Sequence, residues 1–147
     1  MTILVSACLL GVACKYSGGS NDCPALLAAL QAGGHRWVPV CPEVYGGLPT
    51  PRAPAERRGG RVVTANGADV TPAFRRGAEA ALHLARQAGC TAAILKANSP
   101  SCGYGAVYDG RFCGRLTEGS GVTAALLAEN GIPVYNETNF ARLLGAK

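Results

Sequence analysis

The segment TILVSA (residues 2–7) decides the fold class. It is a nearly continuous apolar run, without the alternation of apolar and polar residues that marks a strand with one face in water. A strand of this kind is covered on both faces, as in a parallel sheet between two layers of helices. The same character predicts further strands at RWVPVC (36–41), TAAILKA (91–97) and IPVYN (132–136). Pro39 in the second of them favours a place near the sheet edge.

Helical segments alternate with these strands. The sequence predicts helices over residues 22–33, 69–89, 120–131 and 137–146. Asp22 is the expected N-cap of the first helix and Thr71 that of the second. Strands that alternate with helices predict a single three-layer α/β/α domain over residues 1–147, with a mainly parallel, Rossmann-like sheet.

Two segments break this alternation. Residues 42–68 are rich in Gly and Pro, and only RVVTANG within them suggests a short strand followed by a turn. A loop of this length in a compact domain is usually functional or disordered. The segment AVYDGRFCG (106–114) predicts a hairpin that turns at Asp109-Gly110.

The composition of the chain argues against a disordered or membrane-spanning protein. Hydrophobic residues make up 48% of the chain and charged residues 16%, which argues against disorder. No apolar run approaches the roughly 20 residues of a membrane helix, and the N-terminus lacks the basic start of a signal peptide. We therefore expect a cytoplasmic protein. In that compartment the seven cysteines are expected to be metal ligands, reactive groups or small core residues rather than disulfides. Cys90 and Cys113 are assigned to the core.

The net charge of +5 comes partly from arginines clustered in one segment, which are Arg52, Arg57, Arg58 and Arg61. The simplest interpretation is a solvated face, and the alternatives are an anionic ligand or weak RNA contact. Single-strand binders interleave basic residues with aromatic ones, and this chain has no repeat of that pattern. No stable nucleic-acid complex is expected.

Three cysteines fall at the ends of predicted strands. Cys8 follows the first, Cys41 ends the second and Cys102 lies in the loop after the third. The carboxyl ends of parallel strands share one edge of a sheet, so these thiols are expected to meet there, and Cys14 can also reach that edge. The close pairs of zinc sites and the runs of ferredoxins are absent. A metal or iron–sulfur site, a cysteine nucleophile and buried structural thiols therefore all stay open.

Polar neighbours accompany these thiols. Glu43 lies two residues after Cys41 and is either a general acid or base, or a capping or surface carboxylate. Ser99 and Ser101 flank Pro100 just before Cys102. Their hydroxyls either serve the turn or meet a ligand near Cys102.

Several motifs together resemble a known family. These are SACLLG, GVACKYSGG, PVCPEVYGGLPTPRAPAE, DVTPAF, LKANSPSCG, YDGRFCG and GVTAALLAENGI, in this order. They resemble a bacterial family, long a domain of unknown function, whose characterised members are thiouracil desulfurases. The likeness runs over nearly the whole chain, and VCPE, GGLPTPR and SPSCG are together highly specific.

The resemblance implies a 4Fe–4S cluster held by Cys8, Cys41 and Cys102, with one iron left without a protein ligand. Cys14 also falls on a family cysteine and is the alternative ligand. Glu43 matches the catalytic glutamate of the family, and Ser99 matches its substrate-site serine. On this basis we predict a catalytic role for Glu43 and Ser99, and a substrate-binding role for the neighbouring Ser101. Family members more often read Cys-Arg-Tyr-Asp-Gly where this chain has CKYSG (14–18), so the resemblance assigns no substrate role to Lys15 or Ser17.

The activity implied by the resemblance is a non-redox desulfuration. A thiolated pyrimidine, either 2-thiouracil or a thio-nucleoside or nucleotide, would bind through its soft sulfur to the open iron. Water activated by Glu43 would then attack the ring carbon, giving the oxo-base and sulfide. The arginine cluster raises the hypothesis that a nucleotide is preferred, through Arg52 or Arg57. The alternative is a non-enzymatic iron–sulfur or metal-binding sulfur carrier, which has no need of Glu43.

Overall fold

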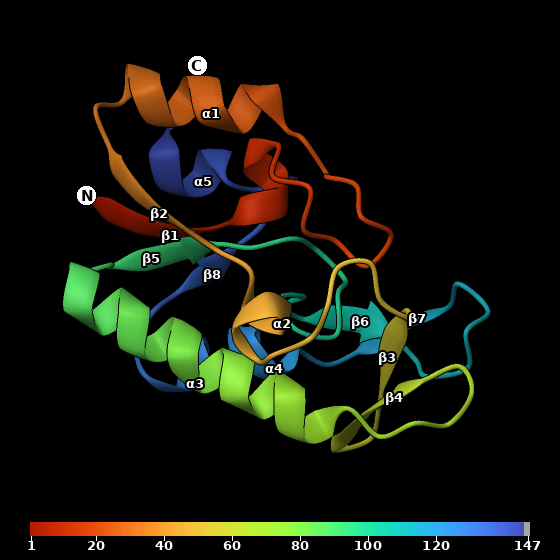
Figure 1. The fold of residues 1–147 in the computed structure, drawn as a ribbon. Helices are drawn as coiled ribbons and strands as arrows, with labels where there is room; N and C mark the ends of the chain where they lie inside the picture. The colour runs from red at the N-terminus through yellow and green to blue at the C-terminus, as the bar shows by residue number, and fades with distance from the viewer. Residues whose placement is uncertain (146–147) are drawn as a thin grey trace.

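A four-stranded parallel sheet forms the centre of the molecule in the computed structural model, which describes residues 1–145 (Figure 1). Its strands are β1 (Thr2–Ser6), β2 (Arg36–Val40), β5 (Ala92–Ile94) and β8 (Val134–Tyr135). Their order across the sheet is β2-β1-β5-β8, so β2, with Pro39, lies at an edge as expected. Every pairing in this sheet is parallel.

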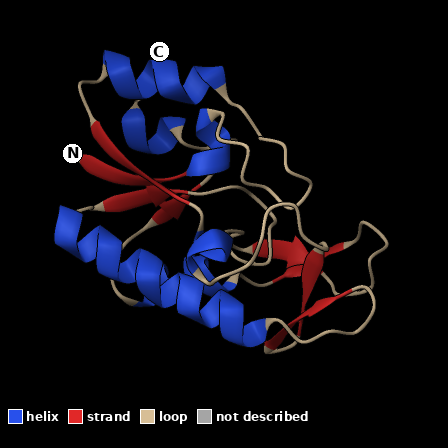
Figure 2. Cartoon of the chain, in the orientation of Figure 1, coloured by secondary structure: helices blue, strands red, loops and turns tan. Residues whose placement is uncertain are grey.

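Helices cover both faces of this sheet. Helices α1 (Pro24–Ala32) and α5 (Ala141–Leu144) lie on one face, and α3 (Thr71–Ala88) and α4 (Val122–Glu129) lie on the other (Figures 1 and 2). The predicted three-layer α/β/α architecture is confirmed. The last predicted helix ends at residue 146, which lies outside the described residues. Within residues 1–145, no helix combines the length and apolar character needed to cross a membrane.

The alternating side chains of β1 fill two separate cores. Ile3 and Val5 pack with Leu26 and Leu30 of α1. Leu4, which lies between them, packs in the opposite core with residues of α3 and α4. All five of these side chains are completely buried. Burying a side chain of this size contributes about 1.5–3 kcal/mol, so the unbroken apolar run of β1 stabilises both interfaces at once.

The glycine- and proline-rich segment contains more structure than predicted. The short helix α2 (Pro42–Tyr45) directly follows β2. Strands β3 (Ala55–Arg58) and β4 (Arg61–Thr64) then form an antiparallel hairpin, which confirms the short strand expected at RVVT. A four-residue helix has too few residues to show a periodic pattern, and this is why α2 escaped prediction.

The second hairpin is wider than predicted. Strand β6 (Ala106–Tyr108) pairs with β7 (Leu116–Glu118), so the connection spans residues 109–115 rather than a tight turn at Asp109-Gly110. The Glu56 carboxylate of the first hairpin accepts the N–H of Gly110 at 3.0 Å. This contact between the two hairpins holds the wide loop open, and local turn chemistry cannot reveal it.

Both predicted N-caps are displaced by one residue. Cys23, rather than Asp22, precedes the first residue of α1. Helix α3 begins at Thr71 itself, and its N-cap is the preceding residue. The Thr71 hydroxyl accepts the Val62 N–H at 2.8 Å, while the Asp69 carboxylate accepts the Thr71 N–H at 2.9 Å. Tertiary pairing with β4 therefore uses the side chain that was expected to cap the helix.

Helix α2 rests on α3 through two glycines. A Cβ atom at Gly77 would collide with the carbonyl of Pro42, and one at Gly46 would collide with the carbonyl of Ala73. The two backbones are therefore in direct contact. This backbone packing contact fixes α2 at the carboxyl end of β2, and it also fixes Glu43 on the first turn of α2.

Gly77→Ala tests this backbone contact. Alanine is favoured over glycine in a helix interior by about 1 kcal/mol, so without the contact the change would stabilise the protein. We expect the opposite, a loss of about 1–3 kcal/mol in the free energy of unfolding, because a rigid carbonyl blocks the new methyl group. Urea denaturation measures it. The control is Gly60→Ala, whose Cβ meets no atom within 4 Å. Equal midpoints for the two variants would contradict the prediction.

Candidate functional site

A cavity of about 630 Å³ opens at the carboxyl edge of the sheet. The chain passes from β1 to β2 on one side and then crosses to β5 on the other, so the strand order reverses between β1 and β5. Ligands of open α/β sheets bind at this kind of switch point. The sequence-predicted site residues that line the cavity are Cys8, Cys14, Cys41, Glu43, Ser99 and Cys102.

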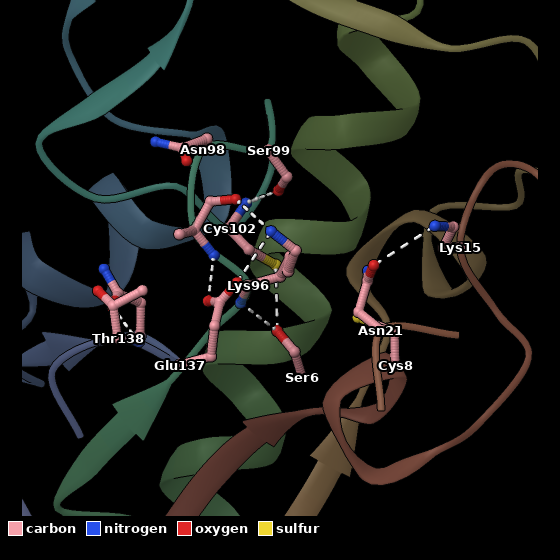
Figure 3. Close-up of polar contacts among 12 residues, drawn as sticks. Ser6, Cys8, Lys15, Asn21, Lys96, Asn98, Ser99, Cys102, Glu137 and Thr138 are labelled. Atoms are coloured by element: carbon pink, nitrogen blue, oxygen red, sulfur yellow. Dashed lines mark hydrogen bonds and ion pairs between the residues drawn. The ribbon is translucent and has the colours of Figure 1, made fainter. Parts of the chain in front are cut away.

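Cys8 lies in a short 3-10 helix that directly follows β1. Its backbone carbonyl accepts the Asn21 N–H at 2.9 Å, and its sulfur accepts the Asn21 side-chain N–H at 3.4 Å. Lys15 in turn donates to the Asn21 amide oxygen at 3.4 Å (Figure 3). The segment that precedes α1 is thereby attached to the thiol at the end of β1. Sequence reasoning missed Asn21, which looks like an ordinary polar residue before a helix.

Cys41 is the residue between β2 and α2, and Cys14 lies beside it. The Cys41 thiol donates to the backbone carbonyl of Cys14 at 3.7 Å. The Cys14 side chain is buried in the same core as Cys8. The structure therefore places four thiols, and not only three, along one cavity.

The turn before Cys102 is shaped by its polar residues. Asn98 adopts a left-handed conformation with φ of 70°, which asparagine tolerates better than most residues. The Ser99 hydroxyl then accepts the Cys102 N–H at 2.7 Å, and the Ser99 carbonyl accepts the N–H of Gly103 at 2.9 Å. Turn chemistry thus accounts for the oxygen of Ser99, and the residue also lines the cavity.

Ser101 does not reach the cavity. Its side chain is completely buried, and its hydroxyl lies 2.8 Å from that of Thr123 on α4. Its carbonyl also accepts the N–H of Thr123 at 2.9 Å. The structure therefore gives the predicted substrate-binding role of Ser101 no geometric support. Ser101 instead joins the turn to the first turn of α4, and so fixes Cys102.

Ser6 and Lys96 connect β1 to this turn, and sequence reasoning assigned neither a role. The Ser6 hydroxyl accepts the Lys96 backbone N–H at 2.9 Å and donates to the Cys102 sulfur at 3.6 Å (Figure 3). The Lys96 ammonium lies 2.9 Å from the Glu137 carboxylate in the segment after β8. The position of Lys96 at the carboxyl end of a buried strand is a signal that could have singled it out.

Glu43 is held by an ion pair that is largely shielded from solvent. Its carboxylate lies 3.6 Å from the Arg52 guanidinium, and the two side chains are only 14% and 8% exposed. Burial raises the pKa of Glu43, and the positive charge of Arg52 acts in the opposite direction. Arg52 also donates to the Cys14 carbonyl at 3.1 Å. The interpretation of the arginine cluster as a solvated face is therefore wrong for Arg52.

The thiols of the cavity lie in an environment that opposes negative charge. Burial raises the pKa of Cys8 and Cys102. Burial, with a smaller contribution from the neighbouring Cys41 side chain, raises the pKa of Cys14 to about 12. The Glu43 carboxylate adds to the increase for all three of the shifted thiols. A cationic centre reverses this balance, since metal binding releases the thiol proton. The donor set fits a soft, positively charged group.

The thiols along the cavity can be compared with the ligand sets of known metal centres. Within residues 1–145, no three Cys, His, Asp or Glu side chains lie close enough together to bind a single metal ion. Cysteine ligands of an iron–sulfur cluster each bind a different iron, so they stand farther apart than the ligands of zinc. The four thiols line one cavity, and the sulfurs of Cys8 and Cys102 accept hydrogen bonds, so their chemistry is compatible with ligands to separate irons.

The remaining cysteines lie elsewhere. Cys90 is buried in the core between the sheet and α3, as predicted. Cys113 is exposed, so its assignment to the core is wrong, because the wide connection between β6 and β7 carries it to the surface. Cys23 is half-buried at the start of α1 and does not line the cavity.

Fold and site together define a three-layer α/β protein with a thiol-lined cavity at the switch point of its parallel sheet. The family model described as 2-thiouracil desulfurase matches residues 3–139, and the chain belongs to this family. The solved structure of the [4Fe-4S]-dependent thiouracil desulfidase TudS is 52% identical, with a TM-score of 0.90 over 97% of this chain and 94% of that one. The uncharacterized protein YbbK of Bacillus subtilis (strain 168) is 41% identical, over 97% of this chain and 99% of its own.

Removing Arg52 tests the ion pair. Arg52→Met leaves the buried Glu43 carboxylate without its partner, and we expect a loss of about 3 kcal/mol in the free energy of unfolding. Adding Glu43→Gln to Arg52→Met removes the charge that was left unpaired. The loss in the free energy of unfolding for this double variant is therefore expected to be smaller than the sum of the two single losses, by about 1 kcal/mol or more. Urea denaturation of the four proteins measures this coupling. Strict additivity would show that the pair contributes nothing.

Proposed function

We propose that this protein is a [4Fe-4S]-dependent desulfurase that removes the sulfur of thiouracil-type pyrimidines. The observation that carries the proposal is the meeting of Cys8, Cys41 and Cys102 in one cavity with the buried carboxylate of Glu43. Membership of the 2-thiouracil desulfurase family and the likeness to TudS support it. The reaction exchanges sulfur for oxygen, with water consumed and hydrogen sulfide released, and it moves no net electrons.

Cys8, Cys41 and Cys102 would hold the cluster as thiolates. The sulfurs of Cys8 and Cys102 already accept hydrogen bonds, from Asn21 and Ser6, and such bonds stabilise a thiolate. When bound through three cysteines, the cluster supplies a Lewis-acidic iron that accepts the soft sulfur of a thiocarbonyl group. The fourth thiol, Cys14, then lines the cavity without holding iron.

Glu43 would move the proton of the attacking water. Arg52 holds the carboxylate in place, and burial brings its pKa closer to neutral, where a general base transfers protons efficiently. Glu43 removes a proton as the water oxygen bonds to the ring carbon. It returns that proton to the departing sulfur when the carbon–sulfur bond breaks, and the carbon-bound hydroxyl loses its own proton, so that the products are the oxo-base and hydrogen sulfide.

Ser99 and the apolar walls would position the pyrimidine. The Ser99 hydroxyl hydrogen can donate to an acceptor on the ring, because the oxygen alone serves the turn. The apolar side chains that line the cavity include Leu48, Pro49, Phe74, Tyr108 and Phe112. Such flat, apolar surfaces suit an aromatic ring and exclude bulk water from the reacting carbon.

The preference for a nucleotide gains no support from the arginines that suggested it. Arg52 is occupied by Glu43 and by the carbonyl of Cys14. Arg57 does not line this cavity. Lys15 and Lys96 are the lysines at the cavity wall, and both are bonded to neighbouring side chains. We therefore propose the free base as the substrate class that this geometry accommodates.

Cysteine substitutions test the ligand set. Anaerobic reconstitution of Cys8→Ala, Cys41→Ala and Cys102→Ala is expected to leave less than half of the wild-type iron and sulfide, because three thiolates are needed to retain the cluster. Cys14→Ala is expected to retain a cluster with the wild-type absorption spectrum. The measurement is iron and sulfide content together with the visible spectrum. Loss of the cluster in Cys14→Ala, with retention in Cys8→Ala, would reverse the assignment.

Glu43→Gln tests the base. The amide keeps the size of the carboxylate but takes up no proton, so we expect the turnover rate for 2-thiouracil to fall by about 10²–10⁴-fold. The iron content should stay at the wild-type level, which separates this effect from loss of the cluster. Desulfuration is followed as sulfide release. A variant with full activity would rule out the base and favour a sulfur carrier, which has no use for a buried carboxylate.

A further inference from the structure

We propose that Asn21, oriented by Lys15, is a positioning residue that stabilises the Cys8 thiolate in the loaded protein and sets the electronic properties of the bound cluster. This inference rests on the proposed function, since it takes Cys8 to be a ligand. It assigns a role to two residues that neither the family resemblance nor the comparisons place in the site. Lys15, Asn21 and Cys8 form a row of hydrogen-bonded side chains along the cavity wall (Figure 3).

The orientation of the Asn21 amide follows from its two partners. The Lys15 ammonium is a donor only, so the group that faces it at 3.4 Å must be the amide oxygen. The amide nitrogen then faces the Cys8 sulfur at 3.4 Å as a donor. The flipped amide would set an N–H against the ammonium and an oxygen against the sulfur. Lys15 therefore fixes Asn21 in the state that donates to sulfur.

Both ends of this chain are held by backbone contacts. The Asn21 N–H is bonded to the Cys8 carbonyl at 2.9 Å, so main chain and side chain approach the same cysteine. Lys15 begins a closed turn in which its N–H donates to the Gly19 carbonyl at 3.1 Å, and its carbonyl accepts the Gly18 N–H at 2.9 Å. Because the backbone hydrogen bonds already hold both segments in place, the side chains of Lys15 and Asn21 can meet without further ordering of the loop between them.

The physical effect of the contact grows when the cysteine is a thiolate. A hydrogen bond to a charged acceptor is roughly twice as strong as one between neutral groups. It also withdraws electron density from the sulfur, and hydrogen bonds to ligand sulfurs are one of the levers that set the potential of an iron–sulfur cluster. The Lys15 charge polarises the amide and strengthens the donor. Ser6 plays the equivalent part at Cys102, whereas the Cys41 thiol is itself a donor, toward Cys14.

The test compares reconstituted holoproteins. We expect Asn21→Leu to speed the release of iron to a chelator by about 10–100-fold, the range for loss of a partner of a metal ligand. Its cluster should have a more negative midpoint potential, because the sulfur donates more strongly to iron. Lys15→Met is expected to shift both quantities in the same direction by a smaller amount. The matched control is Asn130→Leu, which removes an exposed asparagine at the end of α4.

The double variant distinguishes the chain of contacts from a general effect of charge. Since Lys15 acts through Asn21, Lys15→Met should add nothing to the release rate or the potential in the Asn21→Leu background. An equal shift from Lys15→Met in both backgrounds would overturn the role of Lys15, and wild-type release and potential in Asn21→Leu would overturn the proposal. A wild-type protein that assembles no 4Fe–4S cluster at all would instead refute the proposed function.

Discussion

The parallel pairing of β1 with β2 and β5 is the constraint on which the rest of the structure depends. Because these strands run in one direction, every segment that leaves a carboxyl end emerges at the same edge of the sheet. Cys8, Cys41 and Cys102 are separated by dozens of residues in the chain, yet Cys8 and Cys41 lie just after the ends of β1 and β2, and Cys102 lies in the loop after β5. Reversing one strand would carry its thiol to the opposite edge.

The contacts around this edge hold each thiol separately. The Asn21 amide donates a hydrogen bond to the Cys8 sulfur, and the Ser6 hydroxyl donates one to the Cys102 sulfur. The backbone contact of α2 with Gly77 holds the segment after Cys41. Burial meanwhile disfavours the thiolate forms of Cys8 and Cys102. A positively charged centre would displace the thiol protons and stabilise the buried thiolates by electrostatic attraction. The fold therefore favours a cluster over an exposed, reactive thiolate.

The sequence predicted the layers, the strands and the residues at the cavity more reliably than the connections. Long apolar runs and an 18-residue amphipathic helix carry their own signals, and they were found where expected. The short α2, the wide connection after β6 and the exposure of Cys113 were missed or wrong. The helix α2 is too short to show a period, and the wide connection that carries Cys113 depends on the contact of Glu56 with Gly110, which leaves no local pattern.

The sequence alone determined the parallel three-layer fold, because the apolar run of β1 leaves no face for water. It also determined which thiols reach the shared edge, through their places after the strands, and its motifs identified the family. Only the tertiary structure decided how each polar group is used. It turned Ser101 into a structural link to Thr123, paired Arg52 with Glu43 and set Asn21 against Cys8. Hydrogen bonds and ion pairs join residues by proximity in space, and a linear pattern does not encode that proximity.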